Sequence, residues 1–209
     1  MSKSKRIAID TLQFLVNKPT IETGVNRKIN TILEKAQAGC SMIGIIGAAG
    51  IGKSQGALTY ILTSKNAYYI RMLQSYRSKS LFHELVFLIT GQYNQSINLS
   101  STIDYLSELL TKGLEKKLII IDDAGKLKPT DLWLFHTLRR NTITTTGFAF
   151  MGSEYFMDNL LRWREDGKVG IAEFYGQVKL WFFIETDPDQ DLFHEPNGVD
   201  SNDTKRIPL

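Results

Sequence analysis

Residues 42–54, which read MIGIIGAAGIGKS, constrain the fold of this chain more than any other stretch. The stretch opens with a short apolar run bounded by glycine, as a buried strand does. Gly47 is then separated by four residues from the triplet Gly-Lys-Ser at 52–54. This is the spacing of a phosphate-binding loop, which requires a strand before it and a helix after it. The helical pattern over 55–64 meets the second requirement.

Each residue type in this loop has a physical role in holding phosphate. The glycines let the backbone turn sharply and approach phosphate oxygens without a Cβ in the way. Backbone N–H groups of the loop and of the helix start then point at the anion. Lys53 is expected to place a cation on the β and γ phosphates, and the Ser54 hydroxyl is expected to ligate Mg²⁺. The residues predicted to bind the nucleotide are Gly47, Ala48, Ala49, Gly50, Ile51, Gly52, Lys53, Ser54 and Gln55.

The alternative for this stretch is a glycine-rich turn that binds nothing. From typical residue frequencies, a chance match to the spacing in a chain of this length has a probability of roughly 1%. The strand pattern before the motif and the helical pattern after it also favour a functional site. The sequence therefore predicts a site for ATP with Mg²⁺.

The size and charge of the chain favour one domain with a basic body. Of its 209 residues 43% are apolar, which is enough to bury a core. From Glu185 onward there are seven acids and two bases, so residues 1–184, with 23 bases and 15 acids, carry a net charge of +8. A basic body allows an anionic partner, although a solvated surface also explains moderate basicity. We expect an N-terminal extension at 1–20, a core domain at 21–185 and a flexible acidic tail at 186–209.

Several classes of protein are disfavoured. Cys40 is the only cysteine, which excludes a disulfide framework and a cysteine-based metal cluster. The three histidines, His83, His136 and His194, do not have metal-ligand spacing. The chain does not start with a secretory signal pattern, and no apolar run approaches the roughly 18 residues of a membrane span. We expect a cytoplasmic protein with no membrane partner.

Apolar runs typical of strands alternate with amphipathic helical patterns along the core domain. The predicted strands span 42–46, 67–72, 117–123, 146–153 and 178–184. The predicted helices span 22–38, 55–64, 81–90, 102–116, 131–140 and 154–164, with Ser100 or Ser101 capping the fourth. This alternation predicts an α/β three-layer sandwich with a five-stranded parallel sheet. Ligands of such sheets bind at the carboxyl ends of the strands.

Two carboxylates, Asp122 and Asp123, directly follow the apolar run at 118–121. A phosphate-loop enzyme needs a carboxylate there to hold the hydration shell of Mg²⁺, and Asp122 is the candidate. Asp123 is then placed to orient or polarise the attacking water. Ser153, at the end of the next strand, is a candidate to contact the γ-phosphate or that water. The alternatives are a polar strand end and a solvated serine.

Arg162 and Arg164 lie near the end of the predicted helix at 154–164. They are candidates to reach a nucleotide held by a neighbouring subunit and to stabilise charge in the transition state. The alternative is that they are helix-end cations favoured by the helix dipole.

Arg71, Arg77 and Lys79 form a basic patch with Tyr76 among them. Such a patch suits the phosphate backbone of duplex DNA and sequence-independent binding. For each of these residues taken alone, the alternative is a solvated loop.

Taken together, these motifs resemble those of an AAA+ P-loop ATPase over roughly residues 14–184. More narrowly, the helical entry at 20–38, the compact body and the LIIIDDA stretch at 118–124 resemble the transposition-regulator ATPases typified by phage Mu B protein and its TnsC-type relatives. The resemblance implies ATP-dependent rings or filaments assembled on DNA, which regulate transposition or target-site selection by recruiting a transposase. It also implies roles for individual residues: Lys53 and Ser54 on the nucleotide and Mg²⁺, Asp122 on Mg²⁺, Ser153 as the first sensor, and Arg162 and Arg164 as trans-acting arginines.

The chain departs from the family pattern in three places. Asp123 stands where the family usually has glutamate, so its carboxylate is about one methylene further from the water, which would slow hydrolysis without abolishing binding. Gln177 stands where the Mu B-like group is expected to have arginine. The chain ends soon after the strand at 178–184, so the helical lid and its second sensor arginine are expected to be missing or rudimentary.

Three functions compete at this stage. The first is a DNA-associated ATPase whose bound ATP controls self-assembly and partner recruitment. The second is a nucleotide-binding scaffold that hydrolyses ATP slowly or not at all, with ATP as a structural ligand. The third is a small-molecule kinase with the same loop, which is disfavoured because the chain lacks an arginine-rich segment to cover a substrate.

Overall fold

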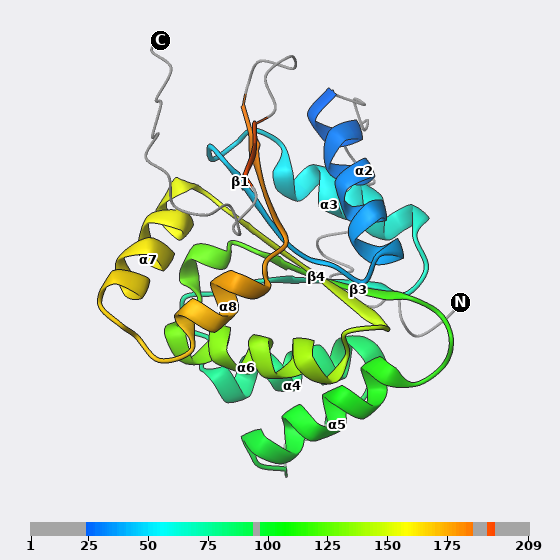
Figure 1. Ribbon diagram of the computed structural model, residues 1–209. Coiled ribbons are helices and arrows are strands. Elements are labelled where there is room, and N and C mark those ends of the chain that lie inside the picture. The colour runs from blue at the N-terminus through cyan, green and yellow to red at the C-terminus, as the bar shows by residue number, and fades with distance from the viewer. Residues whose placement is uncertain (1–23, 94–96, 186–191, 195–209) are drawn as a thin grey trace.

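The computed structural model describes residues 24–93, 97–185 and 192–194 (Figure 1). The predicted extension at 1–20 lies outside these residues, and so does the predicted acidic tail at 186–209 except for 192–194.

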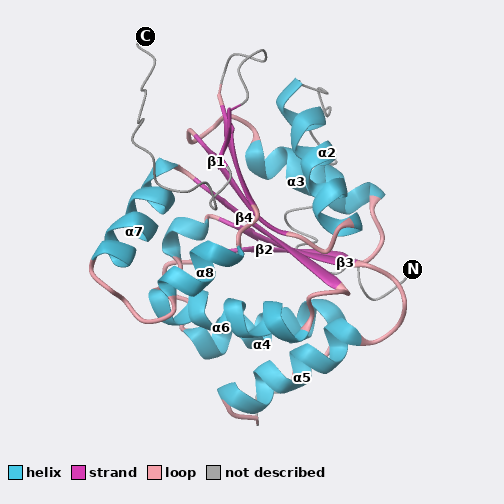
Figure 2. Cartoon of the chain, viewed as in Figure 1, coloured by secondary structure: helices cyan, strands magenta, loops and turns pink. Residues whose placement is uncertain are grey.

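A six-stranded sheet runs through the molecule in the order β2-β3-β4-β1-β5-β6 (Figure 1, Figure 2). The five parallel strands are β1 (Met42–Gly47), β2 (Ala67–Arg71), β3 (Lys117–Asp122), β4 (Thr146–Gly152) and β5 (Leu180–Ile184). The predicted five-stranded parallel sheet is therefore confirmed. A short strand that was not predicted, β6 (Leu192–His194), extends the sheet by pairing antiparallel with β5.

Helices cover both faces of this sheet, which completes the predicted three layers (Figure 1). One face carries α2 (Gly24–Ala38) and α3 (Lys53–Thr63). The other face carries α4 (Ser78–Thr90), α5 (Leu99–Thr111), α6 (Pro129–Asn141), α7 (Glu154–Glu165) and α8 (Ile171–Gln177). A single 3-10 turn, η2 (Ala124–Lys126), follows β3 directly.

Two apolar cores, one under each layer of helices, explain why the central strands are apolar along their whole length. On β1, Ile43 and Ile45 belong to the core shared with α2 and α3, whereas Met42 and Ile46 belong to the core on the other face. All residues of β1 and of β3 are buried. Parallel strands that are covered on both faces read as continuous apolar runs, which made these two recognisable in the sequence.

Gly44 shows how closely the central strands pack around the largest buried side chain. The register of β1 and β5 places Gly44 beside Trp181, which is fully buried. A Cβ on Gly44 would lie 2.0 Å from Cε3 of Trp181. The absence of a side chain at this position therefore leaves the space that the indole fills.

The boundaries of α5 differ from those predicted, for local reasons. Its cap is Asn98 rather than Ser100 or Ser101, because the side chain of Asn98 accepts a hydrogen bond from the N–H of Ser101. The helix also ends before Gly113, whose φ of +84° lies outside the helical region, and does not continue to 116.

Two further helical segments were not predicted. α8 has seven residues and starts after Gly170, whose φ is +82°; it is too short to show a clear period. The other is the first three residues of α4, which begins at Ser78 and not at 81 as predicted. Across the part of the chain that the structure describes, no helix is long and apolar enough to cross a membrane.

Candidate nucleotide-binding site

The predicted phosphate loop lies at the carboxyl edge of the sheet, between β1 and α3. β1 ends at Gly47, and α3 begins at Lys53. Gly50 and Gly52 adopt positive φ angles of 84° and 107°, which glycine adopts without a steric penalty. A Cβ on Gly47 would lie 2.7 Å from the carbonyl oxygen of Ile184 on the neighbouring strand β5. Close strand packing and left-handed turns thus require glycine at these three positions.

The side chain of Lys53 folds back over the loop. Its Nζ donates hydrogen bonds to the carbonyl oxygens of Gly47, at 2.6 Å, and Ala48, at 2.8 Å. Burial lowers the pKa of the Lys53 ammonium, an effect that the negative charges of Asp122 and Asp123 partly oppose. The ammonium is therefore held among loop oxygens in a partly desolvated setting, where its interaction with an anion is stronger than in water.

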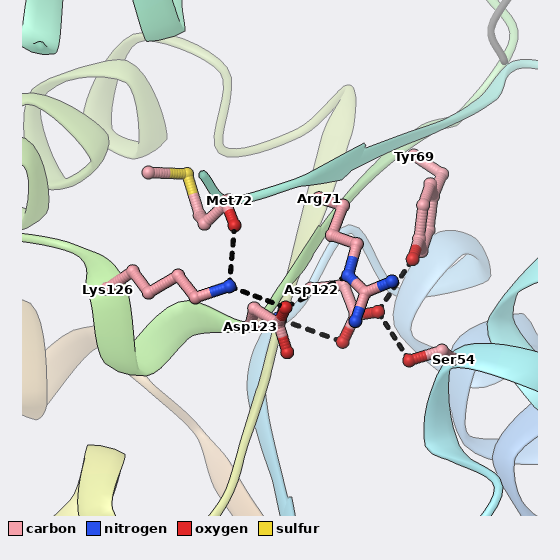
Figure 3. Close-up of polar contacts among 7 residues, drawn as sticks. All are labelled: Ser54, Tyr69, Arg71, Met72, Asp122, Asp123 and Lys126. Atoms are coloured by element: carbon pink, nitrogen blue, oxygen red, sulfur yellow. Dashed lines mark hydrogen bonds and ion pairs between the residues drawn. The ribbon is translucent and has the colours of Figure 1, made fainter. Parts of the chain in front are cut away.

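Asp122 is the centre of the hydrogen bonds between the loop and β3 (Figure 3). It is 2% exposed, and its Oδ2 accepts hydrogen bonds from Ser54 Oγ and from Tyr69 Oη, both at 2.6 Å. Its Oδ1 accepts a hydrogen bond from the backbone N–H of Asp123 at 2.9 Å. Burial and the nearby Asp122 carboxylate raise the pKa of Tyr69, so its hydroxyl remains a donor.

The Ser54 hydroxyl and the Asp122 carboxylate fit the requirements of Mg²⁺. Both supply hard oxygen donors, and Mg²⁺ in nucleotide sites usually has one or two protein oxygens together with phosphates and waters. Within the described residues, no group of three or more histidine, cysteine or acidic side chains is arranged to hold a metal without such help.

Asp123 is engaged by two cations (Figure 3). Its Oδ2 lies 2.9 Å from Nε of Arg71 and 2.9 Å from Nζ of Lys126. Lys126 also donates a hydrogen bond to the carbonyl oxygen of Met72 at 3.1 Å, which ties η2 to the end of β2. Burial alone would raise the pKa of Asp123, but the hydrogen bonds and charges of Lys126 and Arg71 outweigh it and lower that pKa.

The backbone at Asp123 is in the left-handed region, with φ of +54° and ψ of +39°. Aspartate is among the few residues that tolerate this conformation. The turn is closed by a hydrogen bond from the N–H of Lys126 to the carbonyl oxygen of Asp123 at 3.0 Å. The conformation directs the chain from β3 into η2, so the two successive carboxylates have different partners.

Ser153 lies at the same edge of the sheet as the phosphate loop. It follows β4, in which Gly152 pairs with Ile46 of β1, and it is the N-terminal capping residue of α7. Its side chain is half-buried. The predicted sensor position is therefore brought next to the strand that leads into the loop.

Arg162 and Arg164 are exposed and lie toward the other end of α7. Arg162 is nine residues after Ser153, or about 13 Å further along the helix axis. Its Nη2 donates a hydrogen bond to Oδ1 of Asn159 at 2.6 Å, and the guanidinium of Arg164 lies 5.1 Å from the ring centroid of Tyr175. Both arginines therefore have partners on α7 and α8 of their own chain, and Arg162 is more than two helical turns beyond Ser153.

The predicted basic patch is divided in the structure. Arg71 is at the end of β2 and forms an ion pair with Asp123. Arg77 and Lys79 are exposed at the start of α4, where Arg77 is the capping residue. Of the three, the charge of Arg71 is paired with Asp123, whereas Arg77 and Lys79 are exposed at the surface and have no ion pair with that carboxylate.

Two residues of the site, Tyr69 and Lys126, were missed in the sequence. Tyr69 appears there only as part of an apolar strand, and Lys126 as part of a loop. The pairing of β2 beside β3, with Arg71 opposite Asp122, brings Tyr69 to the carboxylates, whereas Lys126 reaches Asp123 from η2, three residues further along the chain. The alternation of Tyr69 with Arg71 along one strand was the available signal, but it has meaning only once the neighbouring strand is known.

A cavity of about 570 Å³ lies away from this edge of the sheet, by the amino ends of β2 and β3. It is lined by Glu34, Gln37, Tyr60, Lys65 and Lys116 among others. No residue of the phosphate loop lines it, so this cavity is separate from the candidate site.

Comparisons with known proteins identify the family and the fold of the chain. A sequence model of the family described as AAA domain matches residues 36–160, more than half of the chain. None of the curated proteins matches the chain in sequence.

Among solved structures, Cdc6p from Pyrobaculum aerophilum is similar with a TM-score of 0.54 and 16% identity, over 78% of this chain and 46% of that chain. Drosophila ORC bound to AT-rich DNA and Cdc6 gives a TM-score of 0.50 and 9% identity, over 79% of this chain and 58% of that one. Drosophila ORC bound to DNA gives 0.48 and 12%, over 65% of this chain and 39% of that one. The chain thus spans less than two thirds of each of these proteins, and the first two share its fold. On the family match and the geometry of its phosphate loop, the chain belongs to the AAA domain family of P-loop proteins.

Proposed function

We propose that this protein binds ATP with Mg²⁺ at the carboxyl edge of its sheet and hydrolyses it. We further propose that the bound nucleotide controls assembly of copies on duplex DNA. The observation that carries the proposal is the link between the phosphate loop and β3, in which Ser54 Oγ lies 2.6 Å from Oδ2 of Asp122. That hydrogen bond joins Ser54, which is predicted to bind the nucleotide and Mg²⁺, to Asp122, which is predicted to bind Mg²⁺ and lies 68 residues further along the chain.

Residues of the loop and of β3 divide the work of binding. Backbone N–H groups after Gly47 and at the start of α3 would hold the phosphates. Lys53 would exchange the carbonyl oxygens of the loop for phosphate oxygens. A hydrogen bond from its ammonium to a negatively charged phosphate oxygen is stronger than one to a neutral carbonyl oxygen. Ser54 and Asp122 would hold Mg²⁺, which when bound neutralises charge on the phosphates.

Asp123 and Ser153 are the proposed groups for hydrolysis. The Asp123 carboxylate would orient the attacking water and accept its proton. Ser153 would donate a hydrogen bond to the γ-phosphate or to that water. The pairs that Asp123 makes with Arg71 and Lys126 oppose the first role, since a carboxylate with a lowered pKa is a weaker base.

Assembly and DNA binding would use the surfaces away from the loop. Arg162 and Arg164 would reach the nucleotide of a neighbouring copy and stabilise charge there. Arg77 and Lys79 would contact the DNA backbone. Drosophila ORC, which is similar in fold, is bound to AT-rich DNA in its solved structure with Cdc6, which supports a DNA partner. By resemblance to transposition-regulator ATPases, the assembled form would recruit a transposase to its target site.

A second candidate is a nucleotide-binding scaffold with little or no turnover. It is favoured by one observation, the engagement of Asp123 by two cations at 2.9 Å. Phosphate release over many turnovers separates the two candidates. The hydrolytic form predicts turnover in the wild type that falls on the order of 10² to 10⁴-fold in Asp123→Asn, whereas the scaffold predicts no difference between the two.

The test of the proposed function is particle size by light scattering with ATP and Mg²⁺, with and without duplex DNA. Wild type is expected to form assemblies that need ATP and grow on DNA. Lys53→Ala is expected to remain small under every condition. A wild-type protein whose size and DNA affinity at low salt do not respond to ATP would contradict the proposal.

A further inference from the structure

Asp122 is a buried carboxylate that accepts three hydrogen bonds. It is 2% exposed, and a buried carboxylate is costly unless it has hydrogen-bond partners. Its Oδ1 accepts a hydrogen bond from the backbone N–H of Asp123, and its Oδ2 accepts hydrogen bonds from the hydroxyl groups of Ser54 and Tyr69. The two donors on one oxygen come from different elements, α3 and β2.

These two hydroxyl groups differ in what they are free to do. Ser54 is in the first turn of α3, is half-buried, and is itself expected to present its oxygen to a cation. Tyr69 is on a strand, is 4% exposed, and packs in the core beneath α2 and α3. A ring packed on a strand fixes the direction of its O–H. Tyr69 is therefore the side chain that keeps the orientation of Asp122 while Ser54 changes partners.

We propose that Tyr69 is a positioning residue of the metal site, whose hydroxyl holds the Asp122 carboxylate facing Ser54 before a cation arrives. The inference rests on the proposed function, since it requires that a divalent cation binds here with a nucleotide. Tyr69 acts on the cation through Asp122 and does not itself reach the nucleotide. Partners of this kind, behind a metal ligand, commonly change metal affinity by about 10 to 100-fold when they are removed.

The chain offers a matched control on the same strand. Tyr68 is 7% exposed and belongs to the core on the opposite face of the sheet. Tyr68→Phe removes a hydroxyl from the same strand at nearly the same burial, but on the side away from Asp122. Tyr69→Phe keeps the ring and its packing and removes only the donor.

The experiment measures the affinity of the full chain for a fluorescent ATP analogue in excess Mg²⁺ and in EDTA. Tyr69→Phe is expected to weaken binding about tenfold in Mg²⁺ and to leave binding in EDTA unchanged. A titration of Mg²⁺ at fixed nucleotide should show half-saturation shifted upward by a similar factor. Tyr68→Phe is expected to match wild type in all three measurements.

Two outcomes would overturn the inference while the proposed function stands. One is a Tyr69→Phe variant that binds like wild type with Mg²⁺. The other is an equal loss with Mg²⁺ and in EDTA, which is what a purely structural role predicts; thermal unfolding of the two variants would confirm that reading. A wild-type protein that binds no nucleotide in either condition would overturn the proposed function, and this inference with it.

Discussion

Nε of Arg71, at the end of β2, lies 2.9 Å from Oδ2 of Asp123, the residue that follows β3. A residue predicted to bind DNA is thus paired with the residue predicted to activate water. The Arg71 side chain is 61% exposed and that of Asp123 is 31% exposed. Exposed ion pairs contribute only about 0.2–1 kcal/mol, so a nucleotide or a partner could release this one at small cost.

Arg71→Ala is expected to raise ATP turnover by about three to ten times. The substitution removes one of the two cations that lower the pKa of Asp123, which makes the carboxylate a better proton acceptor. Steady-state phosphate release at saturating ATP measures the effect. Arg77→Ala, six residues along and exposed, is the control and should leave the rate unchanged. A lower rate in Arg71→Ala would instead mean that Arg71 holds Asp123 in its working position.

Asp123→Asn is expected to remove a pH-dependent part of the stability. The folded-state pKa of Asp123 is below its ordinary value of 3.8, so the carboxylate stabilises the fold above that pH and ceases to do so as the pH falls through the folded-state value. Asparagine tolerates the same left-handed backbone, so strain does not enter the comparison. Denaturant unfolding at a series of pH values should give a constant gap between wild type and variant above about pH 5, which narrows in acid. A gap that does not narrow would show that the charge of Asp123 is not what stabilises this turn.

Lys53→Met is expected to change the stability profile at alkaline pH. Burial lowers the pKa of Lys53 from its ordinary value of 10.5. Between the folded-state value and 10.5 the unfolded chain binds the extra proton, so wild-type stability gains from this group as the pH rises. The variant has no such gain, and the difference in unfolding free energy should move in favour of wild type over that interval. The opposite trend would mean that the ammonium is stabilised by its loop carbonyls more than it is destabilised by burial.

Gly44→Ala is expected to destabilise the fold by about 3 kcal/mol, at the upper end of overpacking effects. Its Cβ would lie 2.0 Å from Trp181, whose indole is fully buried and cannot move without displacing the core. Gly176→Ala is the matched control, since Gly176 is in α8 and a Cβ there would meet nothing within 4 Å. That control should be stabilising by about 0.5–1 kcal/mol. Chemical denaturation of both variants checks the pair, and a mild effect of Gly44→Ala would mean that the central strands yield more easily than their packing indicates.

The double variant Arg77→Ala, Lys79→Ala is expected to weaken DNA binding and to flatten its salt dependence. Each lost phosphate contact lowers the slope of log affinity against log salt by about 0.9, so the pair should lower it by about 2. Arg71→Ala should change the slope less, because Asp123 already neutralises that guanidinium. Fluorescence anisotropy with labelled duplex DNA over a salt series gives the slopes. Equal slopes for wild type and the double variant would place the DNA surface elsewhere.

Much of the fold was predictable because the strands of a covered parallel sheet carry a strong signal. The apolar runs of β1 and β3 are buried on both faces, and their ends carry the loop and the carboxylates. Helix boundaries were less accurate, since they depend on single residues such as the Asn98 cap and the turn at Gly113. The short elements α8 and β6 could not be predicted from a local sequence pattern. α8 depends on its contacts with α6, and β6 depends on its pairing with β5.

The candidate site was predictable as a set of ligands but not as a network. Lys53 and Ser54 were predicted from the spacing of the phosphate loop, and Asp122 was predicted because it directly follows the apolar run at 118–121. Lys126 reaches Asp123 through the local turn of η2, because it is only three residues further along the chain. Tyr69, in contrast, reaches Asp122 only because β2 pairs with β3. The order of strands in a sheet is a property of long-range packing, so the Tyr69 contact could not be predicted from its neighbours in the chain.

The close approach of Gly47 to Ile184 connects the phosphate loop directly to the end of β5. With 2.7 Å between a Cβ position on Gly47 and the carbonyl oxygen of Ile184, the loop backbone cannot move toward β5 without displacing it. β5 runs parallel to β1, so the polypeptide leaves the sheet beside the first glycine of the loop. Glu185, the residue after β5, therefore follows a strand end that packs against the first glycine of the loop, and a reporter dye attached there is expected to sense whether the proposed nucleotide is bound.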